Sequence, residues 1–279
     1  MKIVLVFCTS GVLAAGCSSQ SGGSSSERVV AAFYPLAYAA QQIGGAHVHV
    51  TNLTPAGVEP HDLEATPGDV RKIRSAQLVL LLGHGFQPQL EAAAGHGANV
   101  VRLLDTGGLH RFANGDPHVW LDPFRFALIV RRIGAALHRE RAAARLVIHL
   151  HRLDREYRRG LARCARHEIV TSHEAFAYLS QRYGLEQIAI TGLSPEAEPA
   201  PRDLQHVVDL VRKTHATTVF FETLVSPRIA NTVARETHVK TAVLNPIEGL
   251  THEQAKHGET YFSLMRANLH NLRLALGCR

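Results

Sequence analysis

Short apolar runs alternate with helical segments along most of this chain, and this alternation limits the fold more than any other feature. The runs that predict strands are residues 28–33, 47–53, 77–83 and 98–104, then 168–172, 187–191, 217–221 and 240–244. One of them, QLVLLLG, is apolar throughout, which is typical of parallel strands covered on both faces. Strands that alternate with helices predict an α/β fold with parallel sheets.

The alternation is interrupted once, by a long stretch without strands. Residues 124–139 and 141–164 show only helical periodicity, and the second run is long for a globular helix. We therefore expect two α/β lobes joined by a rigid spine helix, with no internal sequence repeat. The expected boundaries are 28–139 for the first lobe, 140–165 for the linking helix and 166–279 for the second lobe. Within the second lobe we expect helices over 174–184 and 253–276.

The N-terminus has the pattern of a secretion signal. Lys2 precedes a short apolar run that ends in LAAGC at residues 13–17. We expect residues 1–16 to be a lipoprotein signal peptide, Cys17 to carry lipid, and residues 17–27 to form a flexible tether. The alternative is a plain signal peptide with an incidental cysteine. No apolar run long enough for a transmembrane helix follows residue 17. The expected location is extracytoplasmic, anchored to the cell membrane.

Two further cysteines, Cys164 and Cys278, remain in the mature chain. An extracytoplasmic compartment permits a disulfide between them. Sequence alone leaves two free thiols as an open alternative, because it does not give their geometry.

The chain is basic, with 30 Lys and Arg against 24 Asp and Glu. Arginine is concentrated in RRIGAALHRERAAARL and RLDREYRRGLAR, where acids are interspersed at helical spacing. That mixture indicates a solvated helix face with weak attraction to anionic lipid head groups. Because the chain is also expected to be secreted, we expect no nucleic-acid partner.

Four short stretches carry the candidate chemistry. They are GVEPHDLEATPGDV with His61, DPHVWLDP with His118, VTSHEAFAYL with His173, and AVLNPIEGLT with Glu248. Ligands of open α/β sheets bind beyond the carboxyl ends of the strands, and two stretches come from each expected lobe. Each histidine alone is ordinary for a loop. Together, three imidazoles and one carboxylate form a tetrahedral set suited to Zn²⁺ in the cleft between the lobes.

These stretches resemble the zinc/manganese solute-binding lipoproteins of bacterial ABC importers, and the similarity covers essentially the whole mature chain, from AAFYPL to LNPIEGLT. The resemblance implies two lobes joined by a long helix, with the metal ion between them. It implies Zn(II) as transported ligand, held by His61, His118, His173 and Glu248. It also implies delivery to a membrane permease driven by a cytoplasmic ATPase. We expect a monomer.

Two positions distinguish members of this family. Manganese members tend to carry Glu where this chain has His173, and zinc members carry His, which favours zinc. Many members supply an Asp where this chain has Asn245, so the carboxylate three residues later, Glu248, is the expected ligand. Glu222 is the competing carboxylate, and its other interpretation is a buried partner of a basic side chain. The loop 105–115 also lacks the long His-rich insertion of many zinc members.

Other functions remain open at this stage. The same receptor could carry Mn(II) or Fe(II), or a surface adhesin could use the same fold. A zinc hydrolase is disfavoured, because HEAFAY has no second histidine at metalloprotease spacing and no Gly-x-Ser-x-Gly motif occurs. We therefore do not expect an enzyme.

Overall fold

The structure, a computed structural model, describes Met1 and residues 26–279. The expected signal peptide, the lipidated Cys17 and nearly all of the tether lie outside the described residues. Within the described part, no helix combines the length and apolar character needed to cross a bilayer. Both sheets and all the described helices lie between Glu27 and Leu276, so residues 27–279 contain the whole described fold.

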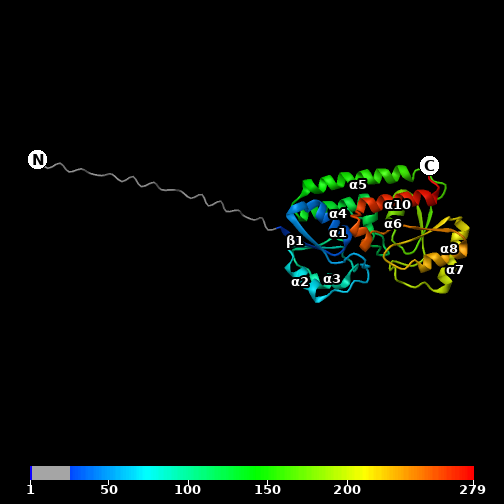
Figure 1. The fold of residues 1–279 in the computed structure, drawn as a ribbon, viewed down its shortest axis with the longest axis horizontal. Helices are drawn as coiled ribbons and strands as arrows, with labels where there is room; N and C mark the ends of the chain where they lie inside the picture. Colours follow the sequence, from blue (N-terminus) through cyan, green and yellow to red (C-terminus); the bar gives the residue numbers. More distant parts are fainter. Residues whose placement is uncertain (2–25) are drawn as a thin grey trace.

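Two four-stranded parallel sheets form the two lobes, which confirms the expected α/β fold (Figure 1). Their strand orders are β2-β1-β3-β4 and β6-β5-β7-β8, the same order in both lobes although the sequence has no repeat. The first sheet consists of β1 Glu27–Ala31, β2 Val48–Asn52, β3 Leu78–Leu81 and β4 Val100–Arg102. The second consists of β5 Glu168–Thr171, β6 Glu186–Ala189, β7 Thr218–Phe221 and β8 Lys240–Val243.

Helices cover these sheets, and the longest extends along one side of the whole molecule (Figure 1). They are α1 Tyr34–Gly44, α2 Pro67–Ser75, α3 Pro88–Ala94, α4 Pro123–Ala136, α5 Glu140–Gly160, α6 Ala177–Tyr183, α7 Pro201–Thr214, α8 Arg228–Thr237, α9 His252–Lys256 and α10 Tyr261–Leu276. Helix α5 packs on α4, α1 and α10 and so spans both lobes. One-turn 3₁₀ segments are η1 Gly45–His47, η2 Leu103–Asp105 and η3 Val119–Leu121.

Two sequence-based expectations about helices are wrong, and one helix was not expected. The helix expected over 253–276 is two helices, because Gly258 adopts a φ of 70° and Thr260 caps α10 through a capping box with Ser263. The helix expected from residue 174 begins at Ala177, since the preceding residues form the turn that holds His173. Helix α3 was not expected, because its seven residues are too few to show a clear period.

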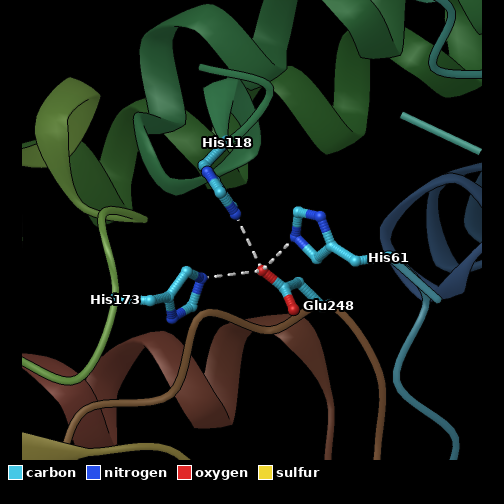
Figure 2. Close-up of side chains that lie close together, drawn as sticks. All are labelled: His61, His118, His173 and Glu248. Atoms are coloured by element: carbon cyan, nitrogen blue, oxygen red, sulfur yellow. Dashed lines mark hydrogen bonds and ion pairs between the residues drawn. The ribbon is translucent and has the colours of Figure 1, made fainter. Parts of the chain in front are cut away.

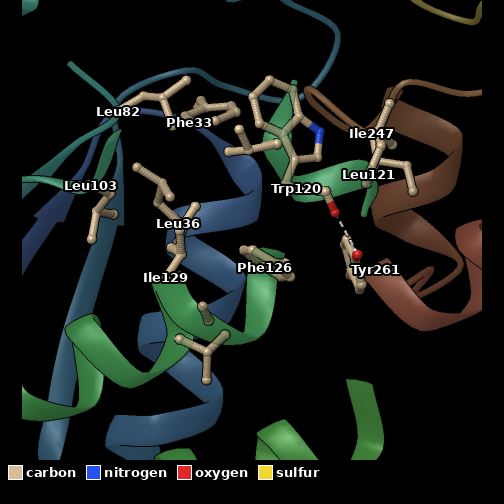
Figure 3. Close-up of a cluster of buried hydrophobic side chains, with 14 of the residues drawn as sticks. Phe33, Leu36, Leu82, Leu103, Trp120, Leu121, Phe126, Ile129, Ile247 and Tyr261 are labelled. Carbon is tan, nitrogen blue, oxygen red and sulfur yellow. Dashed lines mark hydrogen bonds between the residues drawn. The ribbon is translucent and has the colours of Figure 1, made fainter. Parts of the chain in front are cut away.

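The hydrophobic core does not follow the division into lobes. The larger cluster joins the first sheet, part of the second lobe and helices α4 and α5, which we call the spine helices. Figure 3 shows its centre around Phe33, Trp120 and Tyr261. The Trp120 indole donates to the Pro246 carbonyl at 2.7 Å, and the Tyr261 hydroxyl donates to the Trp120 carbonyl at 2.6 Å. A second cluster lies between the second sheet and helices α7 and α8. The two lobes are therefore joined by buried packing as well as by a helix.

A disulfide joins Cys164 and Cys278 across a sequence separation of 114 residues. The closed loop contains the whole second sheet together with its helices. Cross-linking a loop of this length restricts the unfolded chain strongly.

We expect the double substitution Cys164→Ser and Cys278→Ser to lower the free energy of unfolding by about 4 kcal/mol, because the unfolded chain regains its loop entropy. Urea denaturation of residues 27–279, followed by circular dichroism, measures this change. An unchanged denaturation midpoint would show that the cross-link contributes nothing to the stability of the second lobe.

Candidate metal centre

The four residues singled out from the sequence lie together between the lobes. Figure 2 shows the three imidazoles directed at one carboxylate oxygen of Glu248. His61 comes from the loop between β2 and α2, and His118 directly precedes η3. His173 follows β5, and Glu248 lies between β8 and α9. The metal-binding atoms of all four lie within 4.8 Å of one another.

Distances within this cluster fit a tetrahedral ion. Glu248 Oε1 lies 2.8 Å from His118 Nε2, 3.4 Å from His61 Nε2 and 3.5 Å from His173 Nε2. Ligands at roughly 2.0–2.1 Å from a tetrahedral Zn²⁺ are separated by about 3.3 Å. Only the contact with His118 is clearly shorter than this edge. Small shifts of the side chains would therefore produce a tetrahedral donor set.

Two of the imidazoles are oriented by carboxylates on their other ring nitrogen. His118 Nδ1 lies 2.7 Å from Asp116 Oδ1, and His173 Nδ1 lies 2.7 Å from Glu222 Oε1. A proton on Nδ1, donated to the carboxylate, leaves the Nε2 lone pair free for a metal ion. His173 Nε2 is buried and lies 3.5 Å from Glu248 Oε1, too far for a good hydrogen bond. This nitrogen is therefore available to a metal ion.

The turn before Glu248 has an unusual backbone. Ile247 adopts a φ of 58°, which is unfavourable for a β-branched residue. The Asn245 carboxamide oxygen accepts from the Ile247 amide at 2.7 Å, and the Asn245 amide donates to Asn268 Oδ1 at 2.8 Å. These bonds, and the Trp120 bond to Pro246, hold the strained turn that directs Glu248 inward. The structure therefore places Asn245 in the supporting turn and outside the donor cluster.

His61 is the ligand candidate nearest to solvent. Its side chain is 12% exposed, whereas those of His118, His173 and Glu248 are at most 1% exposed. Its ring contacts Phe86, with centroids 4.8 Å apart. His61 is thus the one of the four side chains that solvent reaches.

Burial and mutual contact shift the protonation of the cluster strongly. Burial alone would lower the pKa of His173, but the carboxylates of Glu222 and Glu248 outweigh it and raise that pKa to about 10. His118 follows the same pattern: burial lowers its pKa, and the bonds to Asp116 and Glu248 produce a net rise. Burial opposes ionisation of Glu248, yet its bonds to the three histidines hold its pKa well below the ordinary value. The metal-free cluster therefore combines an ionised Glu248 with a protonated His173.

Sequence reasoning missed two carboxylates around the site. Asp116 is one of them: aspartate in a turn is ordinarily solvated, but this side chain is buried against His118. Glu59 was overlooked; its Oε1 accepts from the His61 amide at 3.0 Å, and Glu59, Glu222 and Glu248 form a second close group. Burial, and then repulsion by Glu248, raises the pKa of Glu59 to about 9. The position of Glu59 two residues before His61 was the only signal in the sequence.

Comparison with known proteins agrees with this geometry. The family model described as "Zinc-uptake complex component A periplasmic" matches residues 29–275. The chain is 34% identical over 287 residues to the zinc-binding lipoprotein AdcA of Streptococcus pneumoniae, covering 92% of this chain but 57% of that protein. It is 32% identical to the high-affinity zinc uptake system protein ZnuA of Bacillus subtilis, covering 98% of this chain and 96% of the relative.

Solved structures show the same architecture. The Zn(II)-bound ZnuA-like domain of Streptococcus pneumoniae AdcA superposes with a TM-score of 0.78 at 35% identity, covering 90% of this chain and 99% of that domain. The laminin binding protein Lmb of Streptococcus agalactiae superposes with a TM-score of 0.82 at 29% identity, with the same coverage. The latter is described as bifunctional, with adhesin and metal transporting activity.

The two orienting carboxylates give a first prediction. We expect Asp116→Asn and Glu222→Gln each to weaken metal binding by roughly 10–100-fold, because each imidazole loses its anionic partner. Competition titration with a chromophoric chelator measures this change. Glu186→Gln is the matched control, since Glu186 is exposed on β6 and no hydrogen bond or ion pair joins its side chain to a histidine of the site. Equal affinities in all three variants would contradict the orienting role.

The raised pKa values give a second prediction. His173 and His118 must lose their protons when an ion binds, whereas Glu248 is already ionised. We therefore expect about one to two protons to be released per ion at pH 7.5, and the affinity to rise with pH up to about 10. Calorimetry in buffers of different ionisation enthalpy counts these protons. The absence of proton release, with a flat affinity between roughly pH 6 and 9, would contradict the assigned protonation.

Proposed function

Because the chain belongs to the ZnuA family of periplasmic zinc-uptake components, we propose that it is an extracytoplasmic receptor that captures Zn²⁺ for import. Its ligands are His61, His118, His173 and Glu248, and Zn²⁺ is its cargo. The observation that carries this proposal is the convergence of three Nε2 atoms from both lobes on one buried carboxylate oxygen. Members of this family are components of zinc-uptake complexes that bind the transported ion, and the chain is accordingly not an enzyme.

The donor set favours zinc over manganese. Three imidazole nitrogens and a single carboxylate oxygen suit a borderline ion with tetrahedral preference. Mn²⁺ prefers more oxygen ligands, and nitrogen-rich sites bind Zn²⁺ more tightly in the usual affinity order. The wall formed by Phe86 and Trp120 beside His61 and His118 further limits access of extra water ligands.

Delivery to the membrane is the second part of the proposal. The receptor passes the ion to an ABC permease that is driven by a cytoplasmic ATPase. Release requires separation of His61 and His118 from His173 and Glu248, because the two pairs belong to different lobes. The Trp120 bond to Pro246 and the spine helices oppose a wide opening, so a small displacement accompanies release.

We also propose the organisation of the chain around this role. Residues 1–16 are a signal peptide, a lipid on Cys17 anchors the mature protein, and residues 17–27 are its tether. The first lobe covers 28–139, the linking helix 140–165 and the second lobe 166–279. The lipoprotein name of the Streptococcus pneumoniae relative supports the anchor.

The test is zinc binding by ligand variants of residues 27–279. We expect one tight Zn²⁺ site per chain, and a loss of at least about 100-fold in affinity for His173→Ala and Glu248→Ala, since each removes one of four ligands. His206→Ala, an exposed position on α7, is the control and retains the parent affinity. Mn²⁺ should bind more weakly than Zn²⁺ by at least tenfold.

Zinc binding that is indifferent to His173 and Glu248 would contradict the assigned site. Delivery is tested separately, in cells that depend on the full chain for growth at low zinc. We expect the His173→Ala chain to fail there and the His206→Ala chain to support growth. Growth with the His173→Ala chain would contradict the import role even if the purified protein binds zinc.

A further inference from the structure

The positive charge of the chain is concentrated on one side of the molecule. Ten arginines against three acids lie in helix α5, in helix α10 and in residues 161–166, which follow α5. That excess is larger than the net charge of +6 for the whole chain. The remaining surface is therefore close to neutral. We call the outer side of α5 and α10 the spine face.

Four arginines form a straight row along α5. Arg141, Arg145, Arg152 and Arg159 are all exposed. Their spacings of four, seven and seven residues place them within about 40° around the helix axis. The row is about 30 Å long, because α5 has 21 residues. None of the four forms a hydrogen bond or ion pair with another described residue.

Two of the three acids of α5 pair with basic side chains outside this row and do not neutralise it. Asp154 is buried and accepts from Arg158 and Arg182. Glu156 faces α10 and pairs with Arg266 at 2.9 Å. Asp154 and Glu156 are therefore paired away from the row. Glu140, the third acid of α5, is exposed in the first turn and is the one acid of this helix that is free to offset the charge near Arg141.

An exposed apolar side chain accompanies these arginines. Ile148 lies in the same row of α5 and is 58% exposed. It is one of only four large apolar side chains that are exposed among the described residues. A cationic surface with isolated protruding aliphatic groups is typical of contact with lipid head groups.

The spine face is directed away from the metal centre. The buried side of α5 packs on α4 and α1, and α4 in turn packs on η3, next to His118 (Figures 1 and 2). The arginine row lies opposite that buried side. A flat surface that contacts the spine face therefore leaves the metal centre directed away from it.

We propose that the spine face docks on an anionic phospholipid bilayer, with the arginine row on the head-group phosphates and Ile148 at the interface. Each arginine near an anionic bilayer surface adds attraction of similar size. Because the row is straight, all four arginines can lie against a flat bilayer at the same time. Docking holds the receptor against the membrane with its metal centre directed outward for capture, an orientation that the receptor leaves when it passes the ion to the permease. This inference is independent of zinc binding, which is measured separately on the same variants.

The test uses residues 27–279, so that no lipid anchor contributes, and sedimentation with vesicles. We expect binding to vesicles of equal parts phosphatidylglycerol and phosphatidylcholine, and none to phosphatidylcholine alone. Arg145→Glu, Arg152→Glu and Arg159→Glu together should weaken the binding by about 100-fold. Arg202→Glu, Arg228→Glu and Arg235→Glu, exposed on α7 and α8, change the net charge equally and should weaken it less than about threefold.

A third variant tests the apolar contribution. Ile148→Ser should weaken vesicle binding by about fivefold, since one aliphatic side chain is lost from the interface. All variants should keep the parent zinc affinity and melting temperature. The proposal is overturned if anionic vesicles are not bound, or if the two triple variants weaken binding equally. It is also overturned if a DNA duplex binds as tightly as the vesicles, because the face would then be a general anion site.

Discussion

The contact between Glu248 and three imidazoles is the interaction on which the rest of the structure depends. Glu248 and His173 belong to one lobe, and His61 and His118 to the other, so the cluster closes the cleft through the same atoms that would bind the ion. A buried carboxylate is costly unless it is compensated, and the hydrogen bonds from the imidazoles, together with the protonated His173, provide that compensation before metal binds. The metal ion then replaces the protons in the same arrangement of charge.

The surrounding structure holds these donors in place. Asp116 and Glu222 fix the ring orientation of two histidines, and the strained turn at Ile247 directs Glu248 inward. Trp120 connects the two halves, since its indole reaches Pro246 and its carbonyl accepts from Tyr261. Such preorganisation lowers the ordering cost of binding. The spine helices complete the scaffold, and their outer side is free for a different contact.

Much of this arrangement can be predicted from the sequence. The features that could not be predicted each have a physical reason. The alternation of apolar runs predicts the parallel sheets, and the motifs around His61, His118, His173 and Glu248 predict residues that the structure brings together. The carboxylates that contact the ligands could not be predicted, because an aspartate in a turn, such as Asp116, or a glutamate in a loop, such as Glu59, is usually solvated. The break between α9 and α10 at Gly258 could not be predicted, because the helical periodicity of the sequence continues across it. Predicting that the arginines of α5 lie on one exposed side requires knowing which of its residues the neighbouring helices cover.

Zinc K-edge X-ray absorption spectroscopy on the zinc-loaded protein tests the central claim most directly, because it reports the ligands of the ion without a crystal. The account predicts a four-coordinate shell of three imidazole nitrogens and one carboxylate oxygen at roughly 2.0–2.1 Å, and the loss of one imidazole in His118→Ala. A shell of five or six ligands dominated by oxygen, or one that keeps three imidazoles after His118 is removed, would contradict it.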